Sequence, residues 1–447
     1  MVHSQLQKQI ETPAFTAALT RLYGPEKTAE THDRCKAVLE GFRKTFGGEA
    51  QALFSAPGRT EIGGNHTDHQ HGRVLAPAVN LDILAAASPN ESGVLRIKSQ
   101  GYPVITVDVR ELDARPGEVG TSAALLRGVA NRMAAMGCPL QGRGLDAYLT
   151  STVPGGSGLS SSAAFEVLIG TILNELFGSG RRTPVELAQI GQYAENKYFG
   201  KPCGLMDQLA SSVGGVIAVD FADINAPEVT QLSLDLHAAG YALCILNSGA
   251  GHEDLTAEYA AITDELGAVC RYFGKKTLRE VPEEDFLAAL PQLRAAAGDR
   301  AVNRAFHVYA ENRRVQAEEQ ALRSGDFDRF LSLVRESGRS SAMFLQNIIP
   351  TGQTTSQELM VTIALCESIL AGRGAVRVHG GGVCPAGAFR PFQKTNGGRS
   401  GQGQLPRAVH PSGGRHPLGI RRTGYDRSGY RGSHPLCAGY RAHCAGG

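Results

Sequence analysis

The stretch Val153-Pro-Gly-Gly-Ser-Gly-Leu-Ser-Ser-Ser-Ala-Ala164 carries the strongest indication of the fold. It joins an apolar, strand-like segment at residues 145–153 to an amphipathic, helix-like segment at residues 163–177. Serine is a good N-cap residue, and the first turn of a helix has unpaired backbone N–H groups. Glycine lets an anion approach those groups, and the helix dipole favours negative charge there. The stretch therefore predicts a phosphate-binding loop at residues 155–162, with a flexible Gly/Ser connection as the alternative.

The bulk composition gives no sign of a membrane or nucleic-acid partner. The chain has 447 residues, enough for two or three domains, and its 45 basic and 43 acidic residues nearly balance. It lacks an apolar run of the length that spans a bilayer, and its polar N-terminus does not resemble a secretory signal. Nine scattered cysteines fit a reducing compartment. We expect a cytoplasmic protein, monomeric or weakly homo-oligomeric, without nucleic-acid or membrane partners.

Hydrophobic periodicity indicates an α+β fold, with strands concentrated early in the chain and helices late. Alternating or continuous apolar runs predict strands at residues 52–56, 74–86, 94–98, 104–109, 216–220, 241–246 and 376–378. Helical spacing predicts helices at residues 35–46, 121–136, 163–177, 184–199 and 204–213, and mostly helical structure across residues 256–369. Thr183-Pro184 is a typical helix start.

The last part of the chain differs in composition from the rest. Residues 384–447 contain ten Lys/Arg and one acidic residue, Asp426, with no apolar periodicity, so we expect a disordered tail. A basic RNA-binding tail is one interpretation. We favour another: residues 388–398 can be encoded so that the neighbouring frame reads Ile-Gln-Ala-Phe-Pro-Glu-Asp-Glu-Trp-Trp-Lys, an ordinary acidic enzyme segment. The hypothesis is a frameshift, and a clean open frame across codons 380–395 of the gene would contradict it.

A second informative loop is Pro57-Gly-Arg-Thr-Glu-Ile-Gly-Gly-Asn-His-Thr-Asp-His69. Its dense polar set suits a polyhydroxylated ligand, because carboxylate and imidazole groups match both donors and acceptors. A metal site formed by His66, Asp68, His69 and His71 is a weaker interpretation, since the spacing fits no zinc pattern. A solvated polar turn is the structural alternative.

Two carboxylates stand out further along the chain. Asp207, in Gly204-Leu-Met-Asp-Gln208, has apolar neighbours and is either a helix cap or a base in a pocket. Glu195 lies near the end of a predicted helix. It is either a surface residue or a ligand of Mg²⁺, which prefers one or two carboxylates together with phosphate oxygens.

Taken together, these segments resemble the galactokinases, members of the GHMP small-molecule kinase superfamily. The family loop Gly-Arg-Val-Asn-Leu-Ile-Gly-Glu-His-Thr-Asp-Tyr corresponds to residues 58–69, Pro-x-Gly-x-Gly-Leu-Ser-Ser-Ser to 154–162, and Gly-x-Met-Asp-Gln to 204–208. Lesser agreements lie at residues 255–259, 305–308, 311–312 and 377–382. The resemblance implies a two-domain fold with the active site between the domains: an N-terminal extension (1–34), an α/β domain (35–215), an incomplete α+β domain (216–383) and the tail (384–447).

The resemblance also implies a role for each matching residue. Asp207 would take the proton from the anomeric hydroxyl of a hexose, which the resemblance implies is galactose, and Arg59 would stabilise charge beside the γ-phosphate of ATP. Ser162 and Glu195 would hold Mg²⁺. The residues implied to bind the sugar are Asn65, His66, Asp68 and Tyr259, and those implied to wrap the ATP phosphates are Gly155, Gly156, Ser157, Gly158, Leu159, Ser160 and Ser161.

The chain departs from the family pattern at several positions. Asn65 replaces a glutamate, His69 replaces a tyrosine, and Glu61, where the family has asparagine, is a candidate to compensate. The apolar strand expected after Gly382 is missing from the sequence, so we expect unpaired neighbouring strands, low stability and weak activity. Two other functions stay open: a sister kinase for another sugar or for an alcohol such as mevalonate or homoserine, and a sugar- and ATP-binding regulator without catalysis.

Overall fold

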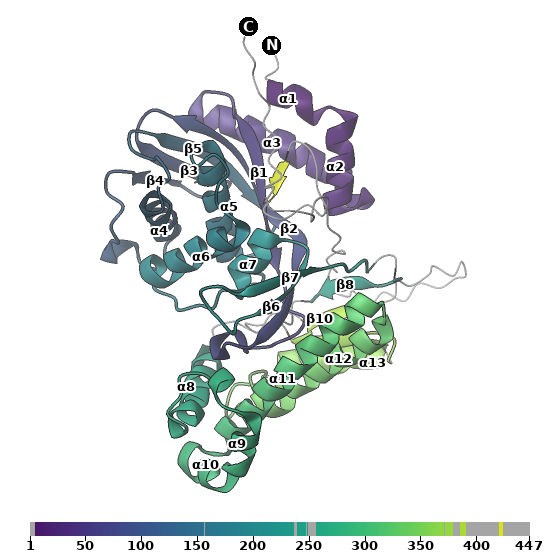
Figure 1. The fold of residues 1–447 in the computed structure, drawn as a ribbon. Coiled ribbons are helices and arrows are strands. Elements are labelled where there is room, and N and C mark those ends of the chain that lie inside the picture. Colours follow the sequence, from purple (N-terminus) through teal and green to yellow (C-terminus); the bar gives the residue numbers. More distant parts are fainter. Residues whose placement is uncertain are drawn as a thin grey trace, which may run out of the picture.

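The computed structural model describes residues 5–155, 157–236, 239–246, 248, 256–370, 372–378, 385–389 and 420–422 of the chain. Two sheets organise these residues, a large one in the upper part of Figure 1 and a three-stranded one beside the helices of the lower part. Within these ranges, no helix has the length and apolar character needed to cross a bilayer.

The long strand β2 (Arg73–Asn90) organises the large sheet. Its second half pairs antiparallel with β1 (Ala52–Arg59) and β5 (Gly144–Ser151), and its first half pairs with β6 (Val216–Asp220). The remaining strands are β3 (Val94–Ser99), β4 (Val104–Asp108), β7 (Glu228–Leu232) and β11 (Ile420–Arg422). Because β6 belongs to this sheet, the domain boundary predicted at 215/216 separates a strand from its partner. Strand β7 was not predicted.

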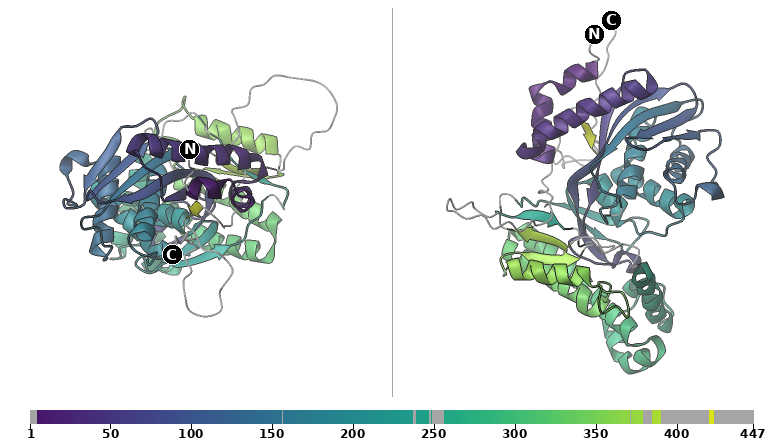
Figure 2. Two further views of the ribbon diagram at one scale, coloured as in Figure 1. Left: turned by 90° about the horizontal axis from the view of Figure 1, so that it is seen from above. Right: turned by 180° about the vertical axis from the view of Figure 1, so that it is seen from behind.

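Helices cover both faces of the large sheet (Figures 1 and 2). Neighbouring strand residues point to opposite faces, so Leu53 and Leu84 enter one core while Phe54 and Ala85 enter the other. The first core contains α1 (Gln5–Ile10), α2 (Pro13–Tyr23) and α3 (Thr28–Phe46), and the second contains α4 (Ser122–Ala135), α5 (Ser161–Leu176) and α6 (Pro184–Ala194). The predicted extension at 1–34 is thus part of a packed layer, and its boundary falls inside α3.

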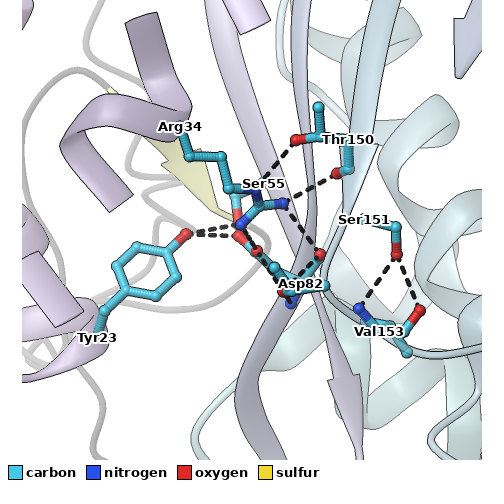
Figure 3. Close-up of polar contacts among 8 residues, drawn as sticks. Tyr23, Arg34, Ser55, Asp82, Thr150, Ser151 and Val153 are labelled. Carbon is cyan, nitrogen blue, oxygen red and sulfur yellow. Dashed lines mark hydrogen bonds and ion pairs between the residues drawn. The ribbon is translucent and has the colours of Figure 1, made fainter. Parts of the chain in front are cut away.

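A buried carboxylate fastens the N-terminal helices to the sheet (Figure 3). Asp82, on β2, is fully buried. Its carboxylate accepts hydrogen bonds from the Tyr23 hydroxyl (2.5 Å) and the Ser55 hydroxyl, and it pairs with Arg34 Nη1 (2.5 Å). Arg34 also donates to the hydroxyl and the carbonyl oxygen of Thr150, at 3.0 and 2.9 Å. The network therefore joins α2 and α3 to β1, β2 and β5.

The same network reaches the point where the chain leaves β5 for the glycine-rich loop. The backbone N–H of Asp82 donates to the Thr152 hydroxyl at 2.9 Å, and the Thr152 N–H donates to the Asp82 carbonyl oxygen at 2.9 Å. The Ser151 hydroxyl then bridges the N–H and the carbonyl oxygen of Val153, at 3.1 and 3.0 Å. These contacts fix the direction in which the loop starts (Figure 3).

The C-terminal half is mostly helical, as the sequence predicted. Its helices are α8 (Thr256–Tyr272), α9 (Glu283–Ala288), α10 (Leu290–Ala297), α11 (Asp299–Ser324), α12 (Phe327–Ser340) and α13 (Glu358–Leu370). Its sheet has the order β8 (Ala242–Ile245), β10 (Pro385–Phe389), β9 (Ala375–Val378). Elsewhere, α7 (Met206–Val213) packs on β1 and β2. Two π-helical turns cover Glu195–Phe199 and Ser341–Leu345. Short 3-10 helices cover Pro25–Lys27, Asp68–Gln70, Pro116–Glu118 and Leu278–Glu280.

Strand β10 differs from the sequence-based expectation. We expected no strand after Gly382 and no regular structure in residues 384–447, but residues 385–389 pair antiparallel with both β8 and β9, and residues 420–422 pair parallel with β1. The backbone supplies the hydrogen bonds of a sheet, so a short segment without apolar periodicity can fill the position. The described neighbours of this position are thus paired, while the expected low stability and weak activity stay predictions. Residues 379–384 and the rest of the tail lie outside the described residues, and the frameshift stays a prediction.

Candidate active site

Three loops that the sequence singled out meet at one place. Arg59, the last residue of β1, donates from Nε to Asp207 Oδ1 at 2.7 Å and from Nη2 to Asp207 Oδ2 at 2.6 Å. Its third nitrogen, Nη1, donates to the carbonyl oxygen of Gly158 at 2.6 Å. A bidentate guanidinium–carboxylate pair fixes both planes. The structure thus brings a cation, a candidate base and the glycine-rich loop together, although Arg59 and Asp207 are far apart in sequence.

The Asp207 carboxylate is ionised at neutral pH. Burial raises its pKa, but the Arg59 guanidinium and the Ser160 hydroxyl, which donates to Oδ2, more than offset that effect and hold the pKa below its usual value. The side chain of Asp207 is still 28% exposed, whereas that of Arg59 is 8% exposed. Asp207 is therefore a fixed, charged acceptor that a ligand in the site can reach.

The glycine-rich loop begins α5 in an unusual way. Ser160 occupies the N-cap position with left-handed backbone (φ 57°), but its hydroxyl donates to Asp207 and does not cap the helix. Gly158 is also left-handed (φ 73°), and the side chain of Leu159 packs in the core. Next to Gly155 a Cβ atom would meet nothing within 4 Å, so one side of the loop is open. Gly156 lies outside the described residues.

Ser162 and Glu195 are adjacent, as the proposed cation site requires. The Ser162 hydroxyl donates to Glu195 Oε1 at 3.0 Å, and Lys201 Nζ lies 3.6 Å from the same oxygen. Glu195 is 2% exposed, which excludes the alternative of a surface glutamate. A hydroxyl and a carboxylate beside the glycine-rich loop are hard oxygen donors, and Mg²⁺ needs few protein ligands when phosphate oxygens supply the others. The residues present therefore fit Mg²⁺.

Helix α11 holds the loop at residues 61–73 in place. Glu311 Oε2 accepts from the Gly64 N–H at 2.9 Å, and Asn312 Oδ1 accepts from the Arg73 N–H at 2.8 Å. His307 Nε2 lies 2.9 Å from the Asn65 carbonyl oxygen. These residues belong to the lesser agreements with the family, which now have a structural meaning: they anchor the polar loop.

Within that loop, two buried polar atoms have no hydrogen-bond partner among the described residues: Asn65 Oδ1 and His66 Nε2. Asn65 is oriented by its Nδ2, which donates to the Ser341 hydroxyl at 2.8 Å. The His66 ring lies 5.3 Å from the Tyr259 ring, and burial, together with His69 and His307, lowers the pKa of His66 to about 3. His66 is therefore neutral at physiological pH.

Asp68 connects the polar loop to the Asp207 loop. A Cβ atom on Gly204 would lie 1.9 Å from Asp68 Oδ2, so the carboxylate occupies the space that any larger residue at 204 would need. The alternative metal interpretation of His66, Asp68, His69 and His71 gains no support. Across the described parts of the chain, no group of three or more His, Cys, Asp or Glu side chains is arranged to hold a metal ion.

A cluster of buried charges lies behind the polar loop. Glu61 Oε2 is 3.5 Å from Arg377 Nη2, and burial raises the pKa of Glu61 to about 7 although Arg377 opposes the rise. Glu318, on α11, is also fully buried, and both its oxygens lack a hydrogen-bond partner within the described ranges. Its carboxylate lies against Gly63, where a Cβ atom would come within 1.9 Å of Oε2. Burial raises the pKa of Glu318 to about 8.

Replacing Glu318 with glutamine is expected to stabilise the protein increasingly as the pH rises from about 5 to 8. The unfolded carboxyl loses its proton near 4.5 and the folded one near 8, so folding takes up a proton in this window and the stability of the parent falls as the pH rises. Glutamine does not ionise and removes a slope of up to about 1.4 kcal/mol per pH unit. Urea unfolding at three pH values measures the difference, with the neighbouring Glu319→Gln as control; parallel curves for Glu318→Gln and the parent would contradict the assignment.

Two residues of the site carried no predicted role. Gln208, directly after Asp207, and Glu166, one helical turn after Ser162, are fully buried and hydrogen-bonded to each other at 3.0 Å. The spacing of four residues between Ser162 and Glu166 was a readable signal, because it places both side chains on the same face of a helix.

Comparison with known proteins assigns the chain, as a first step, to a superfamily. A family model described as the N-terminal domain of GHMP kinases matches residues 124–215, which include the glycine-rich loop and Asp207. The fold is similar to that of a mevalonate kinase from Methanococcus jannaschii, with a TM-score of 0.51, 12% identity, and coverage of 76% of this chain and 90% of that one. The fold and the loop together define a GHMP kinase.

Closer relatives define the family. A model described as the galactokinase galactose-binding signature matches residues 40–89. The chain is 33% identical to a galactokinase of Actinobacillus pleuropneumoniae serotype 5b (strain L20), covering 77% of this chain and 86% of that one, and 35% identical to one of Streptomyces coelicolor (68% and 77%). The structure of Lactococcus lactis galactokinase complexed with galactose superimposes with a TM-score of 0.67 at 25% identity (80% and 90%). The chain belongs to the galactokinase family.

Proposed function

We propose that this protein is a sugar kinase that transfers the γ-phosphoryl group of ATP to the anomeric hydroxyl of α-D-galactose. The observation that carries the proposal is the convergence of Arg59, Asp207 and the carbonyl oxygen of Gly158 within hydrogen-bonding distance. The family supports galactose as the sugar. The unpartnered Asn65 Oδ1 and His66 Nε2 are a buried acceptor and a neutral ring nitrogen of the kind that sugar hydroxyls satisfy.

Asp207 and Arg59 have different roles in the proposed reaction. The anomeric oxygen attacks the γ-phosphorus, the bond from that phosphorus to the bridging oxygen breaks, ADP leaves, and the hydroxyl proton passes to Asp207. Arg59 stabilises the negative charge on the phosphoryl oxygens and keeps the carboxylate in one orientation. Phosphoryl transfer depends mainly on positioning and charge stabilisation, so a guanidinium–carboxylate pair held in one orientation suits this reaction.

ATP and Mg²⁺ are the proposed co-substrate and cofactor. The backbone of Gly155, Ser157, Gly158 and Ser161 would contact the phosphates, Gly156 completing the loop in sequence, while Ser162 and Glu195 would hold the cation. When bound, Mg²⁺ neutralises phosphate charge. Asp68 and Tyr259 would bind further sugar hydroxyls. We further propose a cytoplasmic enzyme, monomeric or weakly self-associating, with small molecules as its only partners.

A panel of acceptors tests the proposal. ATP, Mg²⁺ and either galactose, other hexoses, mevalonate or homoserine are supplied, and ADP release and ³¹P NMR of the product are followed. Galactose is expected to give an anomeric phosphate. A phosphate only on mevalonate or homoserine would assign a sister kinase, and binding of ATP and galactose without ADP release would assign a regulator.

A further inference from the structure

Three side chains form a buried relay behind the proposed cation site. The amide nitrogen of Gln208 donates one N–H to Glu166 Oε2 at 3.0 Å and the other to Glu195 Oε2 at 2.9 Å. Glu166 and Gln208 are fully buried, and Glu195 is nearly so. Glu166 lies on α5, Glu195 lies on the π-helical turn that follows α6, and Gln208 lies on α7. The three members of the relay thus come from three separate elements of the fold.

The relay is costly in a way that a purely structural contact would avoid. Glu166 Oε1 and Gln208 Oε1 have no hydrogen-bond partner within the described part of the chain, and each buried polar group left unpaired costs free energy. Burial raises the pKa of Glu166 well above its usual range, and the neighbouring Glu195 charge adds to the rise. The other charged groups that act on Glu166 are Asp207 and Lys201. An apolar pair would pack α5 against α7 at lower cost.

The contacts of Glu195 give a reason for the free energy that these buried polar groups cost. Glu195 has two oxygens: Oε2 accepts from Gln208, and Oε1 accepts from Ser162. If the Gln208 amide were free to rotate, Oε2 would lose its amide donor, and the contact that holds the carboxylate toward Ser162 would be weakened. Glu166 opposes this rotation because it accepts the second N–H of the same nitrogen at 3.0 Å, whereas Cys203 Sγ, the other contact of that nitrogen, is a weak acceptor at 3.7 Å.

We propose that Glu166 is a positioning residue that acts through Gln208 to hold Glu195 in the orientation for binding Mg²⁺ beside Ser162. The inference rests on the cation-binding role proposed above for Ser162 and Glu195. Residues that orient a metal ligand without touching the metal typically change metal affinity by about 10–100-fold when they are removed.

Glu166→Ala and Glu166→Gln test the relay through binding rather than turnover. For each full-length variant, calorimetry measures the affinity for a non-hydrolysable ATP analogue with and without Mg²⁺, and the ratio gives the gain due to the cation. Glu166→Ala is expected to reduce that gain about 10-fold or more, while the galactose affinity stays at the parental value. Glu166→Gln keeps an acceptor oxygen and is expected to retain the gain; a loss equal to that of Glu166→Ala would overturn the proposal.

Gln208→Ala provides an independent arm if Glu166→Ala does not fold. It is expected to lose the same gain, and the double variant is expected to lose no more than either single one, because the residues act in series. Thr171→Val is the matched control, a buried polar side chain on the same helix whose hydroxyl also lacks a partner among the described residues.

Failure of the relay and failure of the proposed cation site give different results. Ser162→Ala and Glu195→Ala should each abolish most of the Mg²⁺-dependent gain. If they do not, the cation site is wrong. If they do while Glu166→Ala and Gln208→Ala leave the gain unchanged, the relay alone is wrong.

Discussion

Replacing Asp207 with asparagine is expected to lower the turnover number for galactose phosphorylation by about 10²–10⁴-fold, the usual contribution of a positioned general base. Asparagine has nearly the same shape, and its one oxygen can still accept from Arg59 Nη2 and Ser160, but its NH2 group cannot accept from Arg59 Nε and the amide cannot take up the proton of the anomeric hydroxyl. Because the glycine-rich loop is unchanged, the affinity for ATP should stay close to that of the parent. Asp207→Ala should lose turnover at least as severely, since it also releases Arg59.

The measurement separates catalysis from binding. Steady-state ADP release gives the turnover number, and calorimetry gives the affinity for a non-hydrolysable ATP analogue. Asp223→Asn is a suitable control, because Asp223 is an exposed loop residue whose carboxylate, within the described part of the chain, accepts only a local backbone hydrogen bond from Asn225. Parental turnover in Asp207→Asn would eliminate Asp207 as the base, whereas loss of ATP binding along with turnover would indicate that the substitution disturbs the phosphate loop.

Sequence reasoning was most successful where the information was local. The glycine-rich turn and the helix beginning at Thr183-Pro184 each follow from a short segment, because caps, turns and periodicity are properties of neighbouring residues. Thr183 does cap its helix, in a capping box with Glu186. The meeting of Arg59 with Asp207 could not be derived from periodicity. It was expected only from the family resemblance.

What the sequence did not indicate depends on contacts between distant elements. The burial of the Glu318 carboxylate could not be predicted from the sequence, because it results from the packing of α11 against Gly63 of the polar loop. Serine is generally a good N-cap residue, but the left-handed backbone of Ser160 turns its hydroxyl toward Asp207 and away from the cap of α5. The tail was expected to leave its neighbours unpaired, yet strand pairing depends on backbone groups that every composition supplies, and residues 385–389 pair with both β8 and β9. In each case the deciding partner lies far away in sequence.

The second large effect that we expect is a loss of stability when Asp82, which lies outside the proposed active site, is replaced. Asp82→Ala should lower the free energy of unfolding by about 3–5 kcal/mol, the usual cost of removing one partner of a buried ion pair. Burial lowers the pKa of Arg34, and the Asp82 charge more than offsets that effect, so removing the carboxylate leaves a mostly buried cation whose remaining partners among the described residues are the Thr150 oxygens and the backbone carbonyl of residue 82. The Tyr23 hydroxyl loses an acceptor at the same time.

Urea denaturation followed by circular dichroism measures the loss at Asp82, and Asp108→Ala is the matched control. Asp108 also pairs with an arginine, Arg110, but that pair lies at the surface, where ion pairs contribute little, so its removal should hardly move the midpoint. Asp82→Asn should lie between the two, because the amide still accepts from Tyr23 but carries no charge for Arg34. Equal shifts for Asp82→Ala and Asp108→Ala would contradict the role of the network. Because the network also fixes Thr152 at the start of the glycine-rich loop, which we propose binds the ATP phosphates, ATP affinity should weaken in Asp82→Ala at urea concentrations where the chain is still folded, and should not weaken in Asp108→Ala.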